Sequence, residues 1–441
     1  MADVRRVAIV GGGASGTLTA VQLLRRGAVG LQVTVIEPRP ALGRGVAFGT
    51  PDPWHRLNVP AVTMTGLPDD VDHFWRWAGV EPASFPPRAT YGKYLEALLA
   101  EAVAGSPAGF QHRRSRATAI DAEPALRVHL DDGTAVDVDA VVLATGNELP
   151  AIPSFLAGLA GADDQRFIRD PWSEGSLDRV QAGETVVIVG MGHTAMDLAA
   201  SVIHGRRAAH VVAVSRHGEL PRTHEDPWRP RPSSPAFTPA DLAAADDPIA
   251  EAIRRLREYP GGWRQGIDSI RPINRQLWLS LDDATRRRFV TEHRRDWETH
   301  RSRFSAGVGR EIAAWEADGT LERHAGAVRA VSAMPDGLRV ETDDASWTAG
   351  HVLLATGPSE SPSASPLLSS LVAAGIARPG SQDLGVDVDV ETYRLLDADG
   401  VAAREIHALG PIIRGAVWET IAVPEIRAEA AAIAAQILGE G

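Results

Sequence analysis

The 441-residue sequence predicts an α/β fold with two similar βαβ units and a helical insertion. Three observations predict it. A short apolar strand, a glycine-rich turn and a helix follow one another from Arg6 and again from Thr185. The same strand and turn, ending in Leu-Ala-Thr-Gly, closes each unit, over 141–146 and 352–357. The length allows about three domains of ordinary size.

The first unit begins with an apolar strand over 6–10, which leads through the turn Gly11–Gly16 into a helix over 17–26. Gly-x-Gly-x-x-Gly in this context is typical of dinucleotide binding: its glycines allow the tight turn, the approach of a pyrophosphate and close helix packing. The next strand, 31–36, ends in Glu37, which can bind a ribose diol. The alternative is a glycine-rich turn of some other α/β protein.

The second unit repeats this order with a strand over 185–189, the turn Gly190–Ala195 and a helix over 196–204. Its following strand, 210–214, ends in Ser215 and Arg216 instead of an acid. An acid would repel a 2′-phosphate, whereas serine and arginine can bind it, so the sequence favours NADPH over NADH. The alternative is that Arg216 is a solvated surface charge.

A polar hairpin precedes each closing strand, at Asp131-Asp132-Gly133 and at Asp343-Asp344-Ala345. Two Rossmann-like units closed in this way resemble the flavoproteins with two dinucleotide-binding domains. In that superfamily the first unit holds FAD and the second holds the nicotinamide cofactor.

Further segments narrow the resemblance. They are Leu42–Thr50, Leu57–Pro60 with Met64, Pro87-Arg88 with Tyr91–Leu95, Ser215–Gly218, Ala408–Pro411, and Trp418–Thr420 with Val423–Arg427. Together they resemble the bacterial FAD/NAD(P)-binding family related to flavin-dependent N-hydroxylating monooxygenases. Asp139–Gly146 is similar to the Asp-x-x-x-Leu-Ala-Thr-Gly signature of those enzymes. Two departures are Pro150, one residue earlier than usual, and Gly410-Pro411, where many FAD proteins carry Gly-Asp.

The resemblance implies a set of cofactor-binding residues. Those expected at FAD are Gly11, Gly13, Ala14, Ser15, Gly16, Glu37, Gly43, Arg44, Gly45, Ala47, Asn58, Val59, Thr145, Gly146, Gly410 and Trp418. Those expected at NADPH are Gly190, Gly192, His193, Thr194, Ser215 and Arg216. Asn58 is also the candidate catalytic residue, because its amide can donate a hydrogen bond beside the flavin. The alternative role for Asn58 is to cap a turn.

Composition excludes several other classes. The chain has no cysteine, which excludes thiolate nucleophiles, cysteine-ligated zinc and a dithiol redox relay. A net charge of −12 opposes nucleic-acid binding. No apolar run reaches the roughly 18 residues of a membrane span, and the start of the chain shows no secretory core, so we expect a cytoplasmic protein. His293 and His300 lack a third ligand at metal spacing, so no metal is expected.

The predicted domains are 1–165, the first part of the FAD domain; 166–350, the NADPH domain with a helical insertion at about 238–305; and 351–441, the rest of the FAD domain. Helices are predicted over 241–258, 271–281 and 283–303. Arginines between 286 and 295 could line the entry of an anionic substrate, although interleaved acids favour a solvated, salt-bridged face.

The resemblance implies an NADPH-dependent monooxygenase that uses O₂ and N-hydroxylates a small amine-bearing metabolite through a C4a-peroxyflavin. Two alternatives stay open. One is an FAD-dependent NADPH reductase or oxidase that inserts no oxygen. The other is a flavin-binding redox module without enzymatic activity.

Overall fold

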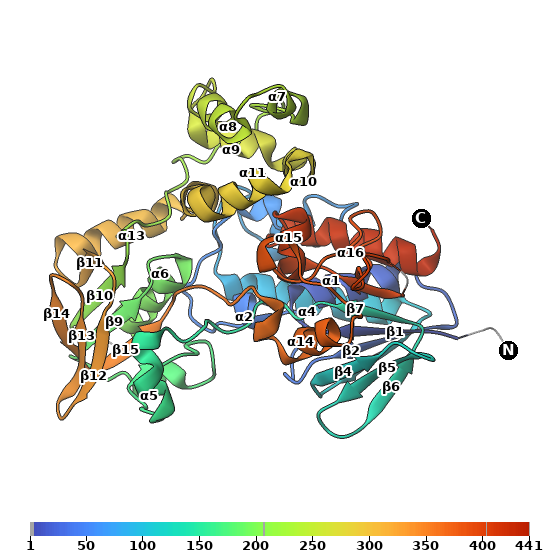
Figure 1. Ribbon diagram of the computed structural model, residues 1–441, viewed down its shortest axis with the longest axis horizontal. Helices are drawn as coiled ribbons and strands as arrows, with labels where there is room; N and C mark the ends of the chain where they lie inside the picture. The colour runs from blue at the N-terminus through green and yellow to red at the C-terminus, as the bar shows by residue number, and fades with distance from the viewer. Residues whose placement is uncertain (1–3, 206–207, 403, 441) are drawn as a thin grey trace.

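The computed structural model describes residues 4–205, 208–402 and 404–440. The expectation about the start of the chain rests partly on residues 1–3, which lie outside these ranges. Two five-stranded sheets form the two ends of the molecule, and a group of helices projects above them (Figure 1). The α/β fold class is therefore confirmed.

The first sheet is parallel, with strand order β16-β7-β1-β2-β3. Its strands are β1 Arg5–Val10, β2 Leu31–Ile36, β3 Gly109–Arg113, β7 Ala140–Leu143 and β16 Ile406–Ala408. Its largest helices are α1 Ala14–Arg26, α4 Arg88–Gly105 and α16 Val423–Leu438. Helix α1 lies between α4 and α16, so the end of the chain packs beside its beginning.

The second sheet is also parallel, with order β11-β10-β9-β15-β8. Its strands are β8 Phe167–Ile168, β9 Thr185–Val189, β10 His210–Ser215, β11 Leu321–Ala325 and β15 His351–Leu354. Helix α6, His193–Ala200, follows β9, and α13, Ala306–Ala317, precedes β11. In both sheets the glycine-turn strand has its successor on one side and the Ala-Thr-Gly strand on the other, so the internal repeat holds in three dimensions.

A three-stranded antiparallel sheet precedes the closing strand of each unit, as the polar hairpins predict. The strands are β4 Ala117–Asp121, β5 Leu126–Leu130 and β6 Ala135–Val138, then β12 Ala330–Met334, β13 Gly337–Glu341 and β14 Ser346–Ala349. Short helices complete the two units: α2 Gly45–Phe48, α3 His73–Ala78, α5 Ala157–Gly161, α14 Pro366–Ala373 and α15 Arg414–Val417.

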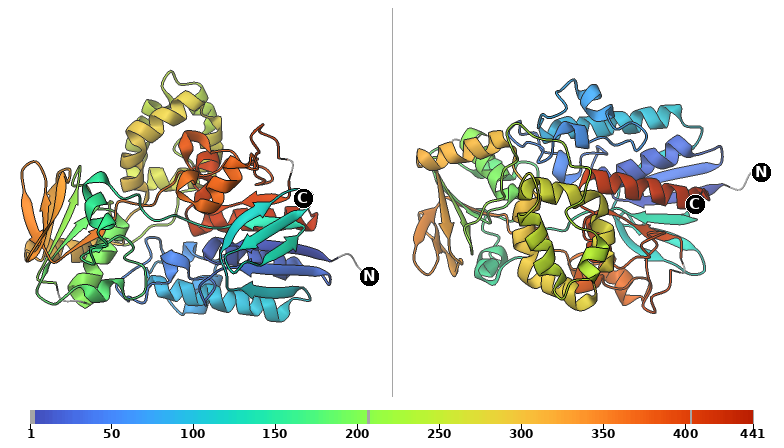
Figure 2. Two further views of the ribbon diagram at one scale, coloured as in Figure 1. Left: turned by 60° about the horizontal axis from the view of Figure 1, so that its bottom comes forward. Right: turned by 90° about the horizontal axis from the view of Figure 1, so that it is seen from above.

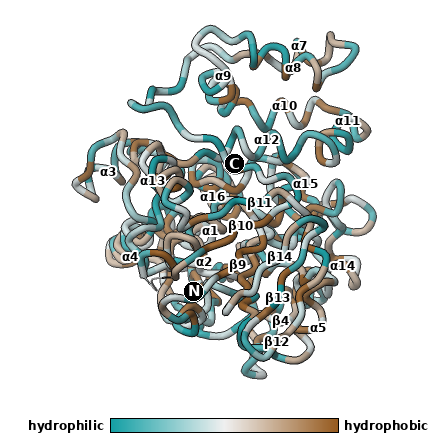
Figure 3. Tube along the Cα trace, turned by 90° about the vertical axis from the view of Figure 1, so that its left-hand side faces the viewer, coloured by the Kyte–Doolittle hydropathy of each residue, from teal (hydrophilic) through white to brown (hydrophobic). Residues whose placement is uncertain are grey.

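The central strands are apolar throughout because both of their faces are covered. Val7, Ala8 and Ile9 are fully buried in the first sheet, as are Val186, Val187 and Ile188 in the second. Figure 3 shows β9 and β10 as brown, hydrophobic segments, whereas the insertion is mostly teal and white. Within the described ranges, no helix combines the length and apolarity needed to cross a membrane.

The insertion is built from short helices (Figure 2). They are α7 Pro239–Ala243, α8 Pro248–Arg257, α9 Trp263–Ile270, α10 Asn274–Ser280, α11 Asp283–Arg288 and α12 Arg294–Arg301. The predicted single helix over 241–258 is wrong, since it divides before Pro248, which has no N–H to continue it. Asp247 caps α8 by accepting from the N–H of Ile249 at 3.0 Å. Helix α9 was not predicted.

The division of the chain into domains remains a prediction. Strand β15 pairs with β9 in the second sheet, so that sheet extends to residue 354. We therefore propose that the second boundary lies just beyond residue 354, a few residues after the position suggested by the sequence.

Candidate functional site

The glycines of the first turn differ in whether the fold itself requires them. Gly11 has φ +104°, and a Cβ there would lie 2.3 Å from the Ala144 carbonyl oxygen; a Cβ on Gly16 would lie 1.9 Å from the Gly11 carbonyl oxygen. Gly13 has φ −71°, and the nearest atom to its Cβ would be Gly45 Cα at 3.6 Å. The fold therefore requires Gly11 and Gly16, whereas packing would tolerate a side chain at Gly13.

The surroundings of Gly13 fit a pyrophosphate. Helix α1 begins there with no capping side chain and no acid in its first turn, so its N–H groups face outward with a favourable dipole. Buried Glu37 accepts a hydrogen bond from the Gly12 N–H at 2.9 Å, which places its carboxylate beside the turn. These features suit the adenosine half of FAD.

Two later segments meet this turn. The Gly43 N–H donates to the Gly12 carbonyl at 2.8 Å, and a Cβ on Gly45 would lie 3.1 Å from Gly13 Cα. From the end of the chain, a Cβ on Gly410 would lie 2.8 Å from Ser15 Oγ. The structure thus brings three separate predicted FAD segments together.

The second glycine turn has the same geometry. Gly190 has φ +132°, and a Cβ there would lie 2.1 Å from the Ala355 carbonyl oxygen. This is the same close contact that Gly11 makes with the Ala144 carbonyl oxygen in the first turn. Gly192, the counterpart of Gly13, has no atom within 4 Å of its Cβ position among the described residues. The turn Gly190–Ala195 therefore forms a second nucleotide cradle. It lies at the edge of the second sheet that corresponds to the position of the first cradle, Gly11–Gly16, in the first sheet.

His193 and Thr194 open helix α6 and are half-buried. His193 Nε2 donates to the Ser302 carbonyl at 3.1 Å, and the imidazole packs on Phe304 at 4.4 Å between ring centres. Burial lowers the pKa of His193 to about 4, so the ring is neutral at neutral pH. Its contact with NADPH remains a prediction.

Ser215 and Arg216 follow β10, at the edge of the sheet that carries the second cradle. Ser215 Oγ accepts from the Gly218 N–H at 3.2 Å. Arg216 is exposed and has no ion pair with the described part of the chain. A cavity of about 390 Å³ lies beside them, lined by Gly218–Thr223, Arg264 and Arg323. A 2′-phosphate would meet a basic surface here.

The segment that carries Asn58 has a fixed backbone and a free side chain. The Leu57 N–H donates to the Pro86 carbonyl at 3.0 Å, and His224 Nε2 donates to the Asn58 carbonyl at 2.9 Å. The half-buried Asn58 amide makes no hydrogen bond to any described residue. Turn capping by this side chain is therefore not seen, and the amide can donate to a ligand.

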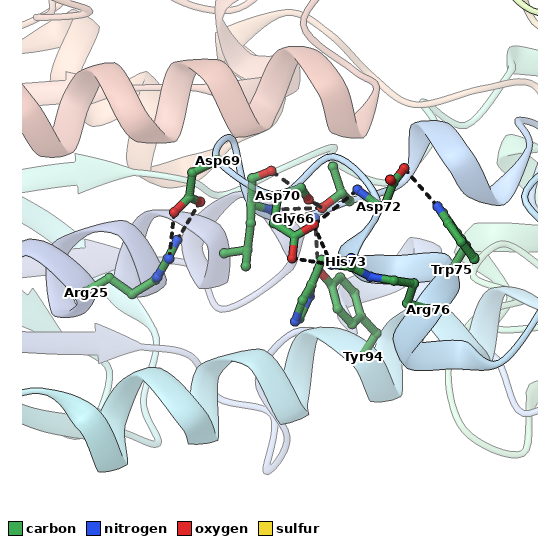
Figure 4. Close-up of polar contacts among 11 residues, drawn as sticks. Arg25, Gly66, Asp69, Asp70, Asp72, His73, Trp75, Arg76 and Tyr94 are labelled. Atoms are coloured by element: carbon green, nitrogen blue, oxygen red, sulfur yellow. Dashed lines mark hydrogen bonds and ion pairs between the residues drawn. The ribbon is translucent and has the colours of Figure 1, made fainter.

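The chain beyond Asn58 is anchored on two helices (Figure 4). The hydroxyl of Tyr94, on α4, accepts from the Gly66 N–H at 3.1 Å and bonds His73 Nδ1 at 2.9 Å. Arg25, on α1, donates through Nη2 to Asp69 at 2.8 Å. These contacts hold the loop in one position over the first unit.

Polar contacts join the two units, and sequence order gave no sign of them. Arg88 pairs with Asp197 of α6 at 2.8 Å. His55 bonds Ser201 Oγ at 2.8 Å and the Asp197 carbonyl at 2.9 Å through Nε2. They fix the orientation of α6, which starts at the second cradle.

The other residues predicted to bind FAD differ in burial and in whether their polar groups are already paired. Thr145 Oγ1 is buried without a hydrogen bond to the described residues, and Gly146 beside it has φ +74°. Arg44 is paired with Glu96 at 2.5 Å, Ala47 is exposed, and Val59 is buried.

Trp418 belongs to the join between the insertion and the end of the chain. Its ring stacks on Trp278 of α10 at 5.0 Å, and the Arg414 guanidinium lies 4.2 Å from the ring centre. Its expected contact with the flavin remains a prediction.

The arginines that the sequence placed near a substrate entry are mostly paired. Arg294 donates to Glu298 at 2.9 Å, Arg288 pairs with Asp247, and Arg295 with Glu219. This confirms the salt-bridged face. A different group of arginines in the insertion, Arg271, Arg301 and Arg303, has buried side chains, and no local sequence pattern marks them. Across the described ranges, no three His, Asp or Glu side chains gather as a metal site.

Comparison with known proteins agrees with these features. Residues 8–148 match the family described as FAD-NAD(P)-binding, which confirms the resemblance and the cofactor class. An L-aspartate N-monooxygenase of Streptomyces davaonensis is 33% identical over 33% of this chain and 25% of its own length. A nitrosuccinic acid synthase of Aspergillus oryzae is 30% identical over 62% of this chain and 47% of its own length. The aligned regions thus span less than half of these relatives.

Solved structures share the whole fold. L-Lysine 6-monooxygenase from Pseudomonas syringae has a TM-score of 0.67 at 16% identity, and ornithine hydroxylase from Pseudomonas aeruginosa has 0.65 at 17%. Each comparison covers 99% of both chains. What these comparisons show is a shared fold over nearly the whole chain.

His224, whose ring donates to the Asn58 carbonyl, should make stability depend on pH. Burial, and next the charge of Arg303, lowers its pKa to about 4. The unfolded chain takes up this proton near pH 6.5, so between these values the unfolded state binds more protons. Stability is therefore complete above about pH 6.5 and falls as the pH drops toward about 4, by roughly 3 kcal/mol from this group.

Urea unfolding across this pH range should show the effect as a difference between the native protein and His224→Gln. The variant should lose less stability on acidification. His217→Gln, at an exposed position, serves as the control and should follow the native curve. Parallel curves for the native protein and His224→Gln would contradict this assignment.

Proposed function

We propose that this chain is an NADPH-dependent, FAD-containing monooxygenase that N-hydroxylates a small amine, with an amino acid as substrate. The observation that carries the proposal is the pair Gly13 and Gly192: each stands at the start of an uncapped helix, and protein packing requires neither glycine. Two dinucleotides are the ligands that such a pair suits. The names of the relatives support amine oxidation.

In this proposal the two glycine turns bind the cofactors, and the Asn58 segment excludes water from the flavin. The first cradle, with Glu37 and Gly45, would hold FAD, and the second, with Ser215 and Arg216, would hold NADPH. Reduced flavin supplies the activation of O₂. The Asn58 segment, fixed by Pro86 and His224, would present an amide donor and exclude water where the flavin reacts.

The direct test is product analysis with L-aspartate, the substrate named for the Streptomyces relative. The FAD-loaded protein is incubated with NADPH and O₂, and hydroxylated amine and hydrogen peroxide are both measured. We expect NADPH oxidation coupled to oxidised amine. NADPH oxidation that gives only peroxide with every amino acid tried would instead support a reductase or oxidase.

Asn58→Ala should separate oxygenation from simple reduction. The variant should keep FAD and oxidise NADPH, because its backbone contacts remain, but release a larger share of the oxygen as hydrogen peroxide. Asn58→Gln retains the amide and is the matched control. Loss of FAD in Asn58→Ala, or unchanged peroxide with substrate present, would remove Asn58 from the oxygenation step.

A further inference from the structure

The loop of the first unit that carries Trp54 and His55 packs directly against the second unit. Trp54 stacks on His204 at 5.1 Å between ring centres, and its indole packs against the core of the second unit. His55 is only 2% exposed, and its Nε2 bonds both the Asp197 carbonyl and Ser201 Oγ. The loop thus contacts α6 and the helical turn that follows it.

A charge pair completes this contact. Arg88 Nη2 lies 2.8 Å from Asp197 Oδ2, and the two side chains are 17% and 12% exposed. Burial raises the pKa of Asp197, and the charge of Arg88 opposes that rise, so the carboxylate depends on Arg88 to stay ionised. Since the loss of hydration offsets much of the attraction, we expect the pair to contribute more to the arrangement of the two units than to their stability.

The residues on the first unit are themselves held in place. The Arg88 N–H donates to the His55 carbonyl at 2.8 Å, and Arg88 Nε donates to the Arg56 carbonyl at 3.0 Å. Thr50 Oγ1 bonds His55 Nδ1 at 2.6 Å, so both ring nitrogens of His55 have partners. Arg56 is two residues before Asn58. The same loop therefore leads into the segment expected beside the flavin.

The other side of the contact leads to the second cradle. Helix α6 begins at His193, directly after Gly192, and Asp197 lies about one turn further along it. A tilt of this short helix at Asp197 would therefore shift Gly192 and a dinucleotide bound there. The loop connects the flavin side of one unit with the cofactor turn of the other.

We propose that Arg88 and His55 are positioning residues for the reduction of the flavin: through Asp197 and Ser201 they set the place at which the second cradle presents the nicotinamide. This step moves a hydride, with both of its electrons, from NADPH to the oxidised flavin and leaves NADP⁺ and anionic reduced flavin. It requires reacting atoms about 3–3.5 Å apart, so a misplacement of about 1 Å can cost about 100-fold in rate. The inference rests on the proposed function, since it assigns residues to one step of that reaction.

Anaerobic stopped-flow reduction of the FAD-loaded protein over a range of NADPH concentrations tests this role. For Arg88→Gln we expect the rate at saturating NADPH to fall by about 10- to 100-fold, because the nicotinamide is misplaced. The dissociation constant for NADPH should change little, since the glycine turn itself is intact. Arg88→Lys keeps the charge and should recover much of the rate. The matched control Arg127→Gln removes an exposed ion pair with Asp137 of the first unit and should leave both values unchanged.

A second measurement needs no turnover. NADP⁺ added anaerobically to the dithionite-reduced protein should give a long-wavelength charge-transfer band when the nicotinamide stacks on the flavin. At equal saturation the band should be weaker in Arg88→Gln than in the native protein and in Arg127→Gln. An unchanged band together with a native rate of reduction would overturn the proposal.

Removing both charges together separates position from stability. Arg88→Gln leaves Asp197 buried without its counter-charge, which by itself destabilises a fold. The double variant Arg88→Met with Asp197→Leu has no unpaired charge at this contact, so its FAD content and melting temperature should stay close to those of the native protein. It should still reduce its flavin slowly. A double variant that reduces flavin at the native rate would show that the pair is only structural.

The outcomes also separate the two proposals. A native protein that is reduced by NADPH and then yields only hydrogen peroxide would refute the monooxygenase function and leave the positioning role standing, because reduction precedes the reaction with O₂. Amine hydroxylation by a protein whose Arg88→Gln variant is reduced at the native rate would do the reverse.

Discussion

Gly13→Leu should give a folded protein that binds no FAD. Its φ of −71° suits any residue, and the nearest atom to a Cβ is Gly45 Cα at 3.6 Å, so the fold should tolerate a side chain. The side chain would occupy the space of the pyrophosphate. We expect FAD affinity to fall by about 100-fold or more, since each hydrogen bond lost to a charged group costs about 1.5–3 kcal/mol.

Flavin absorbance after reconstitution measures this loss, and circular dichroism reports the fold. Gly192→Leu is the matched control: it should keep FAD and lose NADPH. Gly11→Ala differs from both, because its Cβ would lie 2.3 Å from the Ala144 carbonyl oxygen, so it should destabilise the fold itself. A Gly13→Leu protein that holds about one FAD per chain would place the pyrophosphate elsewhere.

Arg216→Ala should weaken NADPH by about 1.5–3 kcal/mol and leave NADH almost unchanged, because only NADPH carries the 2′-phosphate. Arg216 is exposed beside the second cradle and free of ion pairs with described residues, so its charge is available. Dissociation constants for both cofactors, measured by titration, give the comparison.

The exposed Arg329 supplies a control for the loss of one positive charge, and Arg329→Ala should bind both cofactors normally. Equal losses of NADPH and NADH in Arg216→Ala would show that the arginine acts on structure. A native preference for NADH would contradict the choice of cofactor.

The strands and both glycine turns could be predicted from sequence because their signals are local. Strands β2 and β9 have the predicted bounds, since a run of buried apolar residues has few other solutions. The insertion was predicted less well. Its helices are short and depend on caps such as Asp247, so a continuous helical pattern concealed a break at Pro248.

The sequence by itself determined the α/β class, the internal repeat and the cradles for two cofactors, because each depends on residues within one strand, turn and helix. Only the tertiary structure decided which charges are buried together. Arg271 and Glu425 are distant in the chain, and Asn58 and His224 come from different units. Their proximity depends on how α16 and the insertion pack over the first sheet. Sequence order carries no record of such packing, so local patterns indicate the arginines near 290 but not the buried Arg271, Arg301 and Arg303.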